Sequence, residues 1–274
     1  MDASVTDSVN STVIGLMSTA LAVAIVLIAY SLARRFLQPG HETDRTFELA
    51  GNVGVRIAAL HGLILALVYA QELDDYKALR TVLVQEAVAV SDVWNDAKRY
   101  GGRLEPAVQH GMAAYLQEVV ANEWPRLAER KGLSGRAWTT WDDVYVQILD
   151  ANPESPRQEY LRGRMLDRVT EIASFRQQRE AVAQRTFAIL FWIPALVGLA
   201  LLAVPFYLSR PSKTHLILMS LFGAYSGMVL FFIYAFSNPF QAPSRLEPIP
   251  FQHLLDGAIG RTLPTAPEET SGSP

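Results

Sequence analysis

The sequence contains no cysteine among its 274 residues, which excludes disulfide bonds, thiolate catalysis and cysteine-ligated metal sites. Charged residues are also scarce, at 19% of the chain, and the formal net charge is −3. No clustered Lys/Arg face is present of the kind that binding to phosphates needs. We therefore expect no nucleic-acid partner.

The chain also lacks the short motifs that mark common enzymes. It has no glycine-rich phosphate loop, no nucleophile elbow and no His-Glu-x-x-His helix. Its five histidines are scattered, and none is paired at metal-ligand spacing. We predict a protein that is not an enzyme and that holds neither a metal nor a cofactor.

What the sequence does contain is apolar residues in long blocks, at 50% of the chain. This distribution favours an integral membrane protein over a soluble domain. A helix needs about 20 apolar residues to cross the roughly 30 Å hydrocarbon core of a bilayer. We expect a multi-pass protein of the plasma (inner) membrane, with the lipid bilayer as a partner. The predicted spans are residues 13–33, 49–70, 186–209 and 216–236.

The second predicted span differs from the others because it carries Asn52, Arg56 and His61. Charged and titratable side chains at membrane depth are costly unless they face protein or water. Either this helix is shielded inside an assembly, or only residues 57–70 lie in lipid. Both interpretations fit a helix that lines a bundle or a pore.

Small residues recur every four positions on two of the spans. Gly54, Ala58 and Gly62 do so on the second span, and Gly223 and Gly227 on the fourth. Small residues let membrane helices approach closely, so we predict tight packing there. The alternative is chance, because membrane helices are rich in glycine and alanine in any case.

Residues 71–185 separate the first two spans (within residues 1–70) from the last two (186–236) and show helical periodicity. An apolar stripe from Tyr76 to Trp94 continues the second span without a breaker up to Gly101-Gly102. One long helix is therefore expected to leave the membrane and enter this domain.

Three further helices are expected in the domain. They are residues 106–129, which Pro125 kinks or interrupts, residues 138–150, and a helix from about residue 154 that runs straight into the third span. No segment predicts a strand. The predicted fold class is an all-α integral membrane protein with four transmembrane helices and a helical extramembrane domain between the second and third. Residues 237–261 form a proline-rich C-terminal strap, and residues 262–274 are predicted to be a disordered tail.

Several short stretches, in a fixed order along the chain, carry a resemblance to a known family. Asp75-Tyr76 and Trp94–Arg99 follow the second span, Glu123-Trp124-Pro125 lies in the domain, and Asn238-Pro239-Phe240 follows the last span. Over roughly residues 40–260 the chain resembles the bacterial bestrophin-like family of unknown function, a distant relative of the bestrophin ion channels. The residues that match the family's motifs are Tyr76, Asn95, Arg99, Asn238, Pro239 and Phe240.

The chain departs from the bestrophin pattern in three places. Asp75-Tyr76 reverses the family's order, and Gln241 stands where bestrophins have glycine. Ala242–Arg245 replaces the acidic calcium clasp, so we do not expect calcium control of the bestrophin kind. The aromatic residues that narrow a bestrophin pore are also missing from the second span.

Bestrophins are pentameric ion channels, and their pore helix corresponds to the second span here. The resemblance therefore implies a homo-oligomer, a pentamer, that conducts small inorganic ions. Val55, Ala59 and Leu63 would then repeat toward the pore axis as an apolar constriction that gates by dewetting. The alternative is that this stripe packs against a neighbouring helix of the same subunit.

The candidates for charges in the pore are Arg56, His61, Asp74 and Asp75. Asp74 and Asp75 could form a ring of carboxylates that favours cations, or only a solvated helix turn, while Arg56 would favour anions. Counts of Lys and Arg do not decide the topology, and the resemblance favours a cytoplasmic domain. The rival hypothesis is a non-conducting membrane scaffold or sensor whose helical domain binds a partner.

Overall fold

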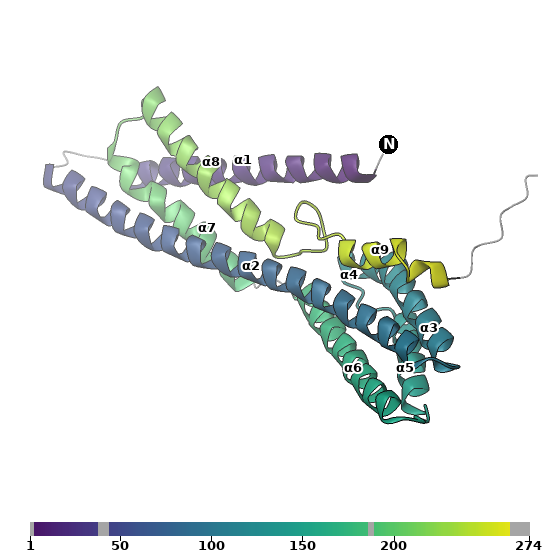
Figure 1. The fold of residues 1–274 in the computed structure, drawn as a ribbon. Helices are drawn as coiled ribbons and strands as arrows, with labels where there is room; N and C mark the ends of the chain where they lie inside the picture. The colour runs from purple at the N-terminus through teal and green to yellow at the C-terminus, as the bar shows by residue number, and fades with distance from the viewer. Residues whose placement is uncertain (1–2, 38–43, 186–188, 264–274) are drawn as a thin grey trace, which may run out of the picture. The chain divides into compact units, whose positions relative to one another are not determined.

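The computed structural model describes residues 3–37, 44–185 and 189–263, and all regular structure in these ranges is helical (Figure 1). The helices are α1 (Ala3–Leu37), α2 (Asp44–Tyr100), α3 (Leu104–Glu118), α4 (Trp124–Ala128), α5 (Gly135–Leu149), α6 (Pro156–Gln184), α7 (Ile189–Ala203), α8 (Lys213–Phe236) and α9 (Ile249–Asp256). A π-helical turn, η1 (Val119–Glu123), joins α3 to α4. Two 3-10 turns, η2 (Val204–Leu208) and η3 (Gly260–Thr262), follow α7 and α9.

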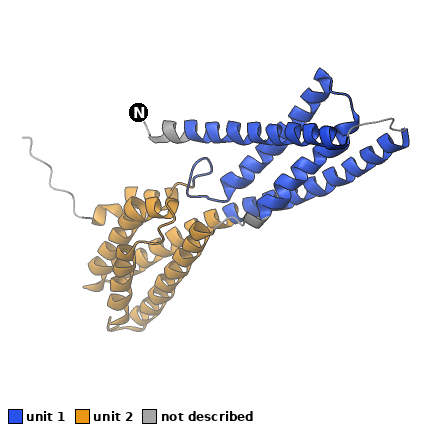
Figure 2. Cartoon of the chain, turned by 180° about the vertical axis from the view of Figure 1, so that it is seen from behind, with its two compact units in different colours: residues 1–76, 186–245 blue, residues 77–185, 246–274 orange. Residues whose placement is uncertain are grey.

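The chain forms two compact units, which Figure 2 distinguishes by colour. The span unit comprises residues 1–76 and 186–245, and the helical unit comprises residues 77–185 and 246–274. Helix α2 contributes to both, since it continues without a break for 57 residues. It ends where Gly101 and Gly102 adopt positive φ angles of 77° and 65°. The predicted long helix and its end at these glycines are confirmed.

The span unit is built around α1. This helix packs along α8 and against α7 and η2. Within the described residues, four helices are long and apolar enough to cross a membrane: α1, α2, α8, and α7 together with η2. The core between them includes Val26, Leu65, Leu199 and Ile233.

Two glycines of α8 allow its contact with α1. A Cβ atom at Gly223 would lie 3.0 Å from the Val23 Cα atom, and one at Gly227 would lie 2.8 Å from the Thr19 Cα atom. The predicted tight packing is confirmed at these positions. On α2, Gly54 approaches Pro205, whereas Gly62 has open space beside it.

In the helical unit, α5 packs between α3 and α6, and α9 lies against α3. Serine residues begin two of these helices, because the Ser134 and Ser155 hydroxyls accept hydrogen bonds from the backbone N–H groups of Ala137 and Gln158. The strap contains a short helix, α9, which begins after Pro248.

One predicted feature is wrong. Helix α6 does not continue into the third span, because Arg185 leaves the helical region with ψ of 120° and α6 ends at Gln184. No glycine or proline marks this end in the sequence. The third span itself tightens to the 3-10 turn η2 at Pro205, which cannot donate a helical hydrogen bond. Residues 186–188 of this span and 264–274 of the predicted disordered tail lie outside the described residues.

The α1–α8 contact predicts the effect of enlarging Gly227. Gly227→Ala places a methyl group 2.7 Å from the Ala22 Cβ atom, and overpacking of this kind costs about 1–3 kcal/mol. We expect the melting temperature of the full chain in detergent to fall by several degrees. Gly163→Ala is the control, because that α6 position has open space and the change favours the helix. Equal melting temperatures for the two variants would contradict this packing.

Candidate pore helix and a buried charge network

Within the span unit, one side of α2 is packed and the other side is free. On the packed side, Leu65 joins the core, and His61 is only 5% exposed. His61 lies against Gly198 of α7, where any side chain would collide with the imidazole ring. On the free side, Val55 is 70% exposed and Leu63 is 56% exposed. This chain alone leaves that apolar side without a partner.

The pore candidates divide between these two sides. Helical periodicity places Ala59 between Val55 and Leu63 on the free side, with Arg56 adjoining them, and both Ala59 and Arg56 are exposed. His61 lies on the packed side, away from them. The structure therefore brings the apolar candidates and Arg56 to one side of α2 and separates His61 from them.

The acidic candidates lie further along α2. Asp74 is exposed, whereas Asp75 is half-buried and accepts a hydrogen bond of 2.9 Å from the Gln71 amide. Their neighbour Glu72 is buried. Asp74 therefore has the more exposed carboxylate of the two candidates.

The motif residues after the last span hold α8 against α2. The Phe236 ring meets the edges of Tyr69 and Tyr76 of α2 at centroid distances of 6.0 and 5.3 Å. In the turn that follows, the Asn238 side-chain oxygen accepts a hydrogen bond from the Phe240 N–H, and Phe240 is fully buried. Pro239 lies between these two residues. This Asn-Pro-Phe motif therefore ends α8 with a locally bonded turn and a buried aromatic anchor.

Asn95 and Arg99 lie in the helical unit and make contacts along α2. The Asn95 amide donates to the Ser91 carbonyl oxygen at 2.8 Å. Arg99 pairs with the buried Asp96 at 2.8 Å, and Asp96 also faces Arg164 of α6 at 3.0 Å. These motif residues join α2 to α6 through Asp96.

Pro125 produces the local geometry that aims Glu123 inward. Since proline has no N–H group, the regular hydrogen-bond pattern cannot continue through residue 125. The chain widens into the π-helical turn η1 directly before it, where the Trp124 N–H bonds to the Val119 oxygen five residues back. Glu123 and Trp124 are both buried as a result.

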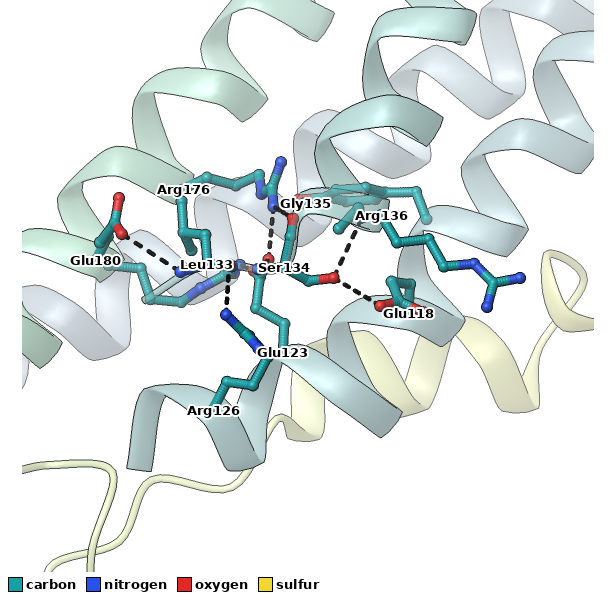
Figure 3. A network of polar contacts seen from close by, with 12 residues as sticks. Glu118, Glu123, Arg126, Leu133, Ser134, Gly135, Arg136, Arg176 and Glu180 are labelled. Carbon is teal, nitrogen blue, oxygen red and sulfur yellow. Dashed lines mark hydrogen bonds and ion pairs between the residues drawn. The ribbon is translucent and has the colours of Figure 1, made fainter. Parts of the chain in front are cut away.

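Glu123 is the centre of a buried charge network in the helical unit. One carboxylate oxygen accepts hydrogen bonds from Arg176 at 2.5 Å and from the Ser134 N–H at 2.8 Å, and the other pairs with Arg179. Figure 3 shows Arg176, Ser134 and Glu123 converging from α6, the start of α5 and the end of η1. Ser134 also donates to Glu118 at 2.6 Å.

The network extends from Arg179 to α2. Arg179 donates to Glu86 at 2.5 Å, and the second oxygen of Glu86 accepts from the Tyr115 hydroxyl at 2.5 Å. The four charged side chains, Glu86, Glu123, Arg176 and Arg179, are fully buried and sum to zero charge. A balanced group of this kind can tolerate burial because each charge has an opposite charge in contact.

The environment holds these groups in defined protonation states. Burial lowers the pKa of Arg179, but the charges of Glu86 and Glu123 outweigh it and raise the pKa above its ordinary value, so the guanidinium stays charged. Burial, supported by the charge of Glu86, raises the pKa of Tyr115 well above 10.0, so the phenol stays neutral and remains a donor.

Aromatic rings connect the network to the C-terminal strap. The Trp124 indole N–H donates to the Leu246 carbonyl oxygen at 2.9 Å, and the Phe251 ring meets Trp124 at 6.0 Å. The Arg179 guanidinium lies 5.6 Å from the centroids of both rings. The strap is therefore fastened to the same residues that surround Glu123.

The family follows from a comparison with known proteins. A family model described as the Bestrophin-like domain matches residues 20–251. The chain belongs to the bestrophin-like family. Known members of this family are ion channels rather than enzymes. No curated protein matches this bestrophin-like chain.

Solved structures of a bacterial bestrophin homologue from Klebsiella pneumoniae share the fold. A point mutant of that homologue matches with a TM-score of 0.57 and 18% identity, covering 90% of this chain and 97% of that one. The structure solved by Zn-SAD phasing matches with a TM-score of 0.54 and 19% identity, covering 90% and 96%. At this identity the likeness shows the bestrophin fold alone.

The sequence patterns did not reveal the charge network of this bestrophin-like chain, although a signal for part of it exists. The apolar stripe of α6 continues in register through two arginines, and its buried positions are Leu161, Met165, Val169, Ile172, Arg176, Arg179 and Ala183. Arginines at core positions indicate buried ion pairs. Their glutamate partners are 53 and 93 residues away, which no local period reveals.

Removing the central carboxylate predicts a large loss of stability. Glu123→Gln leaves two buried arginines with a single carboxylate, and breaking a buried pair costs about 3–5 kcal/mol. We expect the melting temperature in detergent to fall by about 10 °C. Glu129→Gln is the matched control on the same segment, because the exposed pair with Lys131 adds little. A Glu123→Gln variant as stable as this control would show that the network does not support the fold.

The raised pKa of Tyr115 predicts a specific dependence on alkaline pH. Stability from a neutral buried phenol is complete below the unfolded pKa of 10.0 and is lost as pH rises above it. At pH 11 the unfolded phenol gains about 1.4 kcal/mol by ionising, which the buried one cannot do. We expect the stability advantage of the wild type over Tyr115→Phe to shrink by this amount between pH 8 and pH 11. The free energy of unfolding measured for both proteins at both pH values tests this, and an unchanged difference would refute it.

Proposed function

We propose that this chain is the subunit of a homo-oligomeric ion channel, a pentamer as in bestrophins, whose pore is lined by the free side of α2. The observation that carries the proposal is the exposure of Val55 and Leu63 on a membrane-length helix of a bestrophin-like chain. The permeant species are small inorganic ions. The channel lies in the plasma membrane with the helical unit in the cytoplasm.

Arg56 supports an oligomer around a water-filled axis. Its side chain is exposed on the free side of α2, and a guanidinium exposed to lipid at membrane depth is costly. A single subunit has too few spans to surround a central pore, so water reaches Arg56 at the axis only when several copies of α2 meet. His61 lies on the packed side of α2, and we leave it out of the proposed pore.

Ion flux through the purified full chain in liposomes tests this function. Sodium and chloride are replaced separately by large impermeant ions, and loss of flux on replacing one of them identifies the permeant ion. No flux above that of empty liposomes, from protein shown to be folded and oligomeric, would overturn the proposal. That outcome would favour a membrane scaffold or sensor.

A polar substitution at the proposed constriction predicts a gain of flux. Leu63→Ser wets an apolar constriction, and we expect flux to increase several-fold because dewetting no longer blocks the pore. Leu21→Ser is the matched control, since Leu21 is a similarly exposed leucine on α1. Equal flux through the two variants would show that Leu63 does not lie at the constriction.

A further inference from the structure

The span unit contains an apolar cavity that the proposed channel function does not use. Its volume is about 480 Å³, within the range of about 300–1,000 Å³ typical of ligand sites. Helices α1, α2, α8 and the α7–η2 segment all contribute to its lining, and Ser209 and His215 are the polar residues among the lining residues. Phe47, Leu218 and Phe222 line it while remaining exposed, so the cavity opens on the apolar surface of the unit.

One end of the cavity is polar. The Ser209 carbonyl oxygen accepts hydrogen bonds from the Tyr30 hydroxyl at 2.9 Å and from Arg34 at 2.8 Å. The His215 ring lies 5.3 Å from the Tyr30 ring, and its Nε2 atom is buried without a hydrogen-bond partner. The end therefore presents an arginine and an unsatisfied imidazole nitrogen beside a long apolar space.

The same end has an excess of positive charge. Arg34 and Arg35 end α1, Arg210 follows η2, and Lys213 begins α8. No ion pair joins any of these four to a carboxylate of the described residues. Asp44 and Glu48 begin α2, but neither lines the cavity. Apolar walls with a basic end match a molecule that has an acyl chain and a negatively charged headgroup.

We infer that this cavity binds one acyl chain of an anionic phospholipid, with its phosphate held by Arg34 and His215. Arg34 uses one nitrogen for Ser209 and has further N–H groups for phosphate oxygens. The His215 Nε2 atom gains the partner that the protein does not supply. Gly51, Gly54 and Ala58 of α2 line the cavity, so the bound chain contacts the packed side of that helix. The site does not depend on ion conduction.

Lipid binding to the full-length oligomer in detergent tests the inference, with bound molecules counted by native mass spectrometry. The probes are dioleoyl phosphatidylglycerol, dioleoyl phosphatidylcholine with the same chains, and inorganic phosphate. We expect one phosphatidylglycerol per subunit, bound at least about fivefold more tightly than phosphatidylcholine, because one basic residue near a lipid phosphate contributes about that factor. We expect phosphate alone to bind far more weakly.

Two matched pairs of variants locate the site. Gly51→Leu fills the cavity without a collision, and since each buried CH₂ contributes about fourfold, binding should weaken more than tenfold. Gly62→Leu, also on α2 with open space but outside this cavity, should bind as the wild type does. Arg34→Gln should remove the preference for phosphatidylglycerol, and Arg45→Gln should keep it.

Four outcomes would overturn the inference. They are absence of bound lipid, equal binding of the two lipids by the wild type, equal weakening in Gly51→Leu and Gly62→Leu, and phosphate binding as tight as that of phosphatidylglycerol. Melting temperatures confirm that each variant is folded. Should Gly51→Leu fail to fold, the Arg34→Gln and Arg45→Gln pair decides the question alone.

Discussion

The helical unit depends on one carboxylate that faces two buried arginines. Glu123 binds Arg176, Arg179 and the Ser134 N–H group, and Arg179 extends the connection to Glu86 of α2. An arginine taken out of water without this partner would cost several kcal/mol. Sliding α6 by one turn would separate both arginines from Glu123 at once, so the network defines the register of α6 against η1 and α2. Specific alignment, more than net stabilisation, is what a balanced buried group of this kind contributes.

A single proline makes that arrangement possible. Pro125 cannot complete the helical bond pattern, and η1 widens the helix just before it. The wider turn places Glu123 toward the arginines and Trp124 toward the strap, where the indole bonds to Leu246. The Glu-Trp-Pro motif therefore has a physical reason for its order: the proline produces the π-helical turn, the glutamate pairs with the arginines, and the tryptophan holds the strap.

Much of this fold could be predicted from local patterns, because membrane-length apolar blocks and helical periodicity are local properties. The end of α2 at Gly101-Gly102 and the interruption at Pro125 follow from single residues. The end of α6 does not, since Arg185 leaves the helix without a glycine or proline nearby. The charge network also could not be read, because its partners come from four segments of the chain. The sequence equally could not place His61 on the packed side of α2, since that depends on the close approach of Gly198 in α7.

The two sides of α2 within the span unit answer to different solvents. Its packed side has small residues, Gly54 and Ala58, beside an apolar cavity, and aromatic contacts to α8 further along. Its free side combines apolar Val55 and Leu63 with the charged Arg56, a mixture that neither lipid nor a dry interface accommodates well. Repeated around an axis, that side offers apolar rings and a basic ring to water. Only a symmetric assembly gives both Arg56 and its apolar neighbours a favourable environment, so the lining of a channel is the role that this helix supports best.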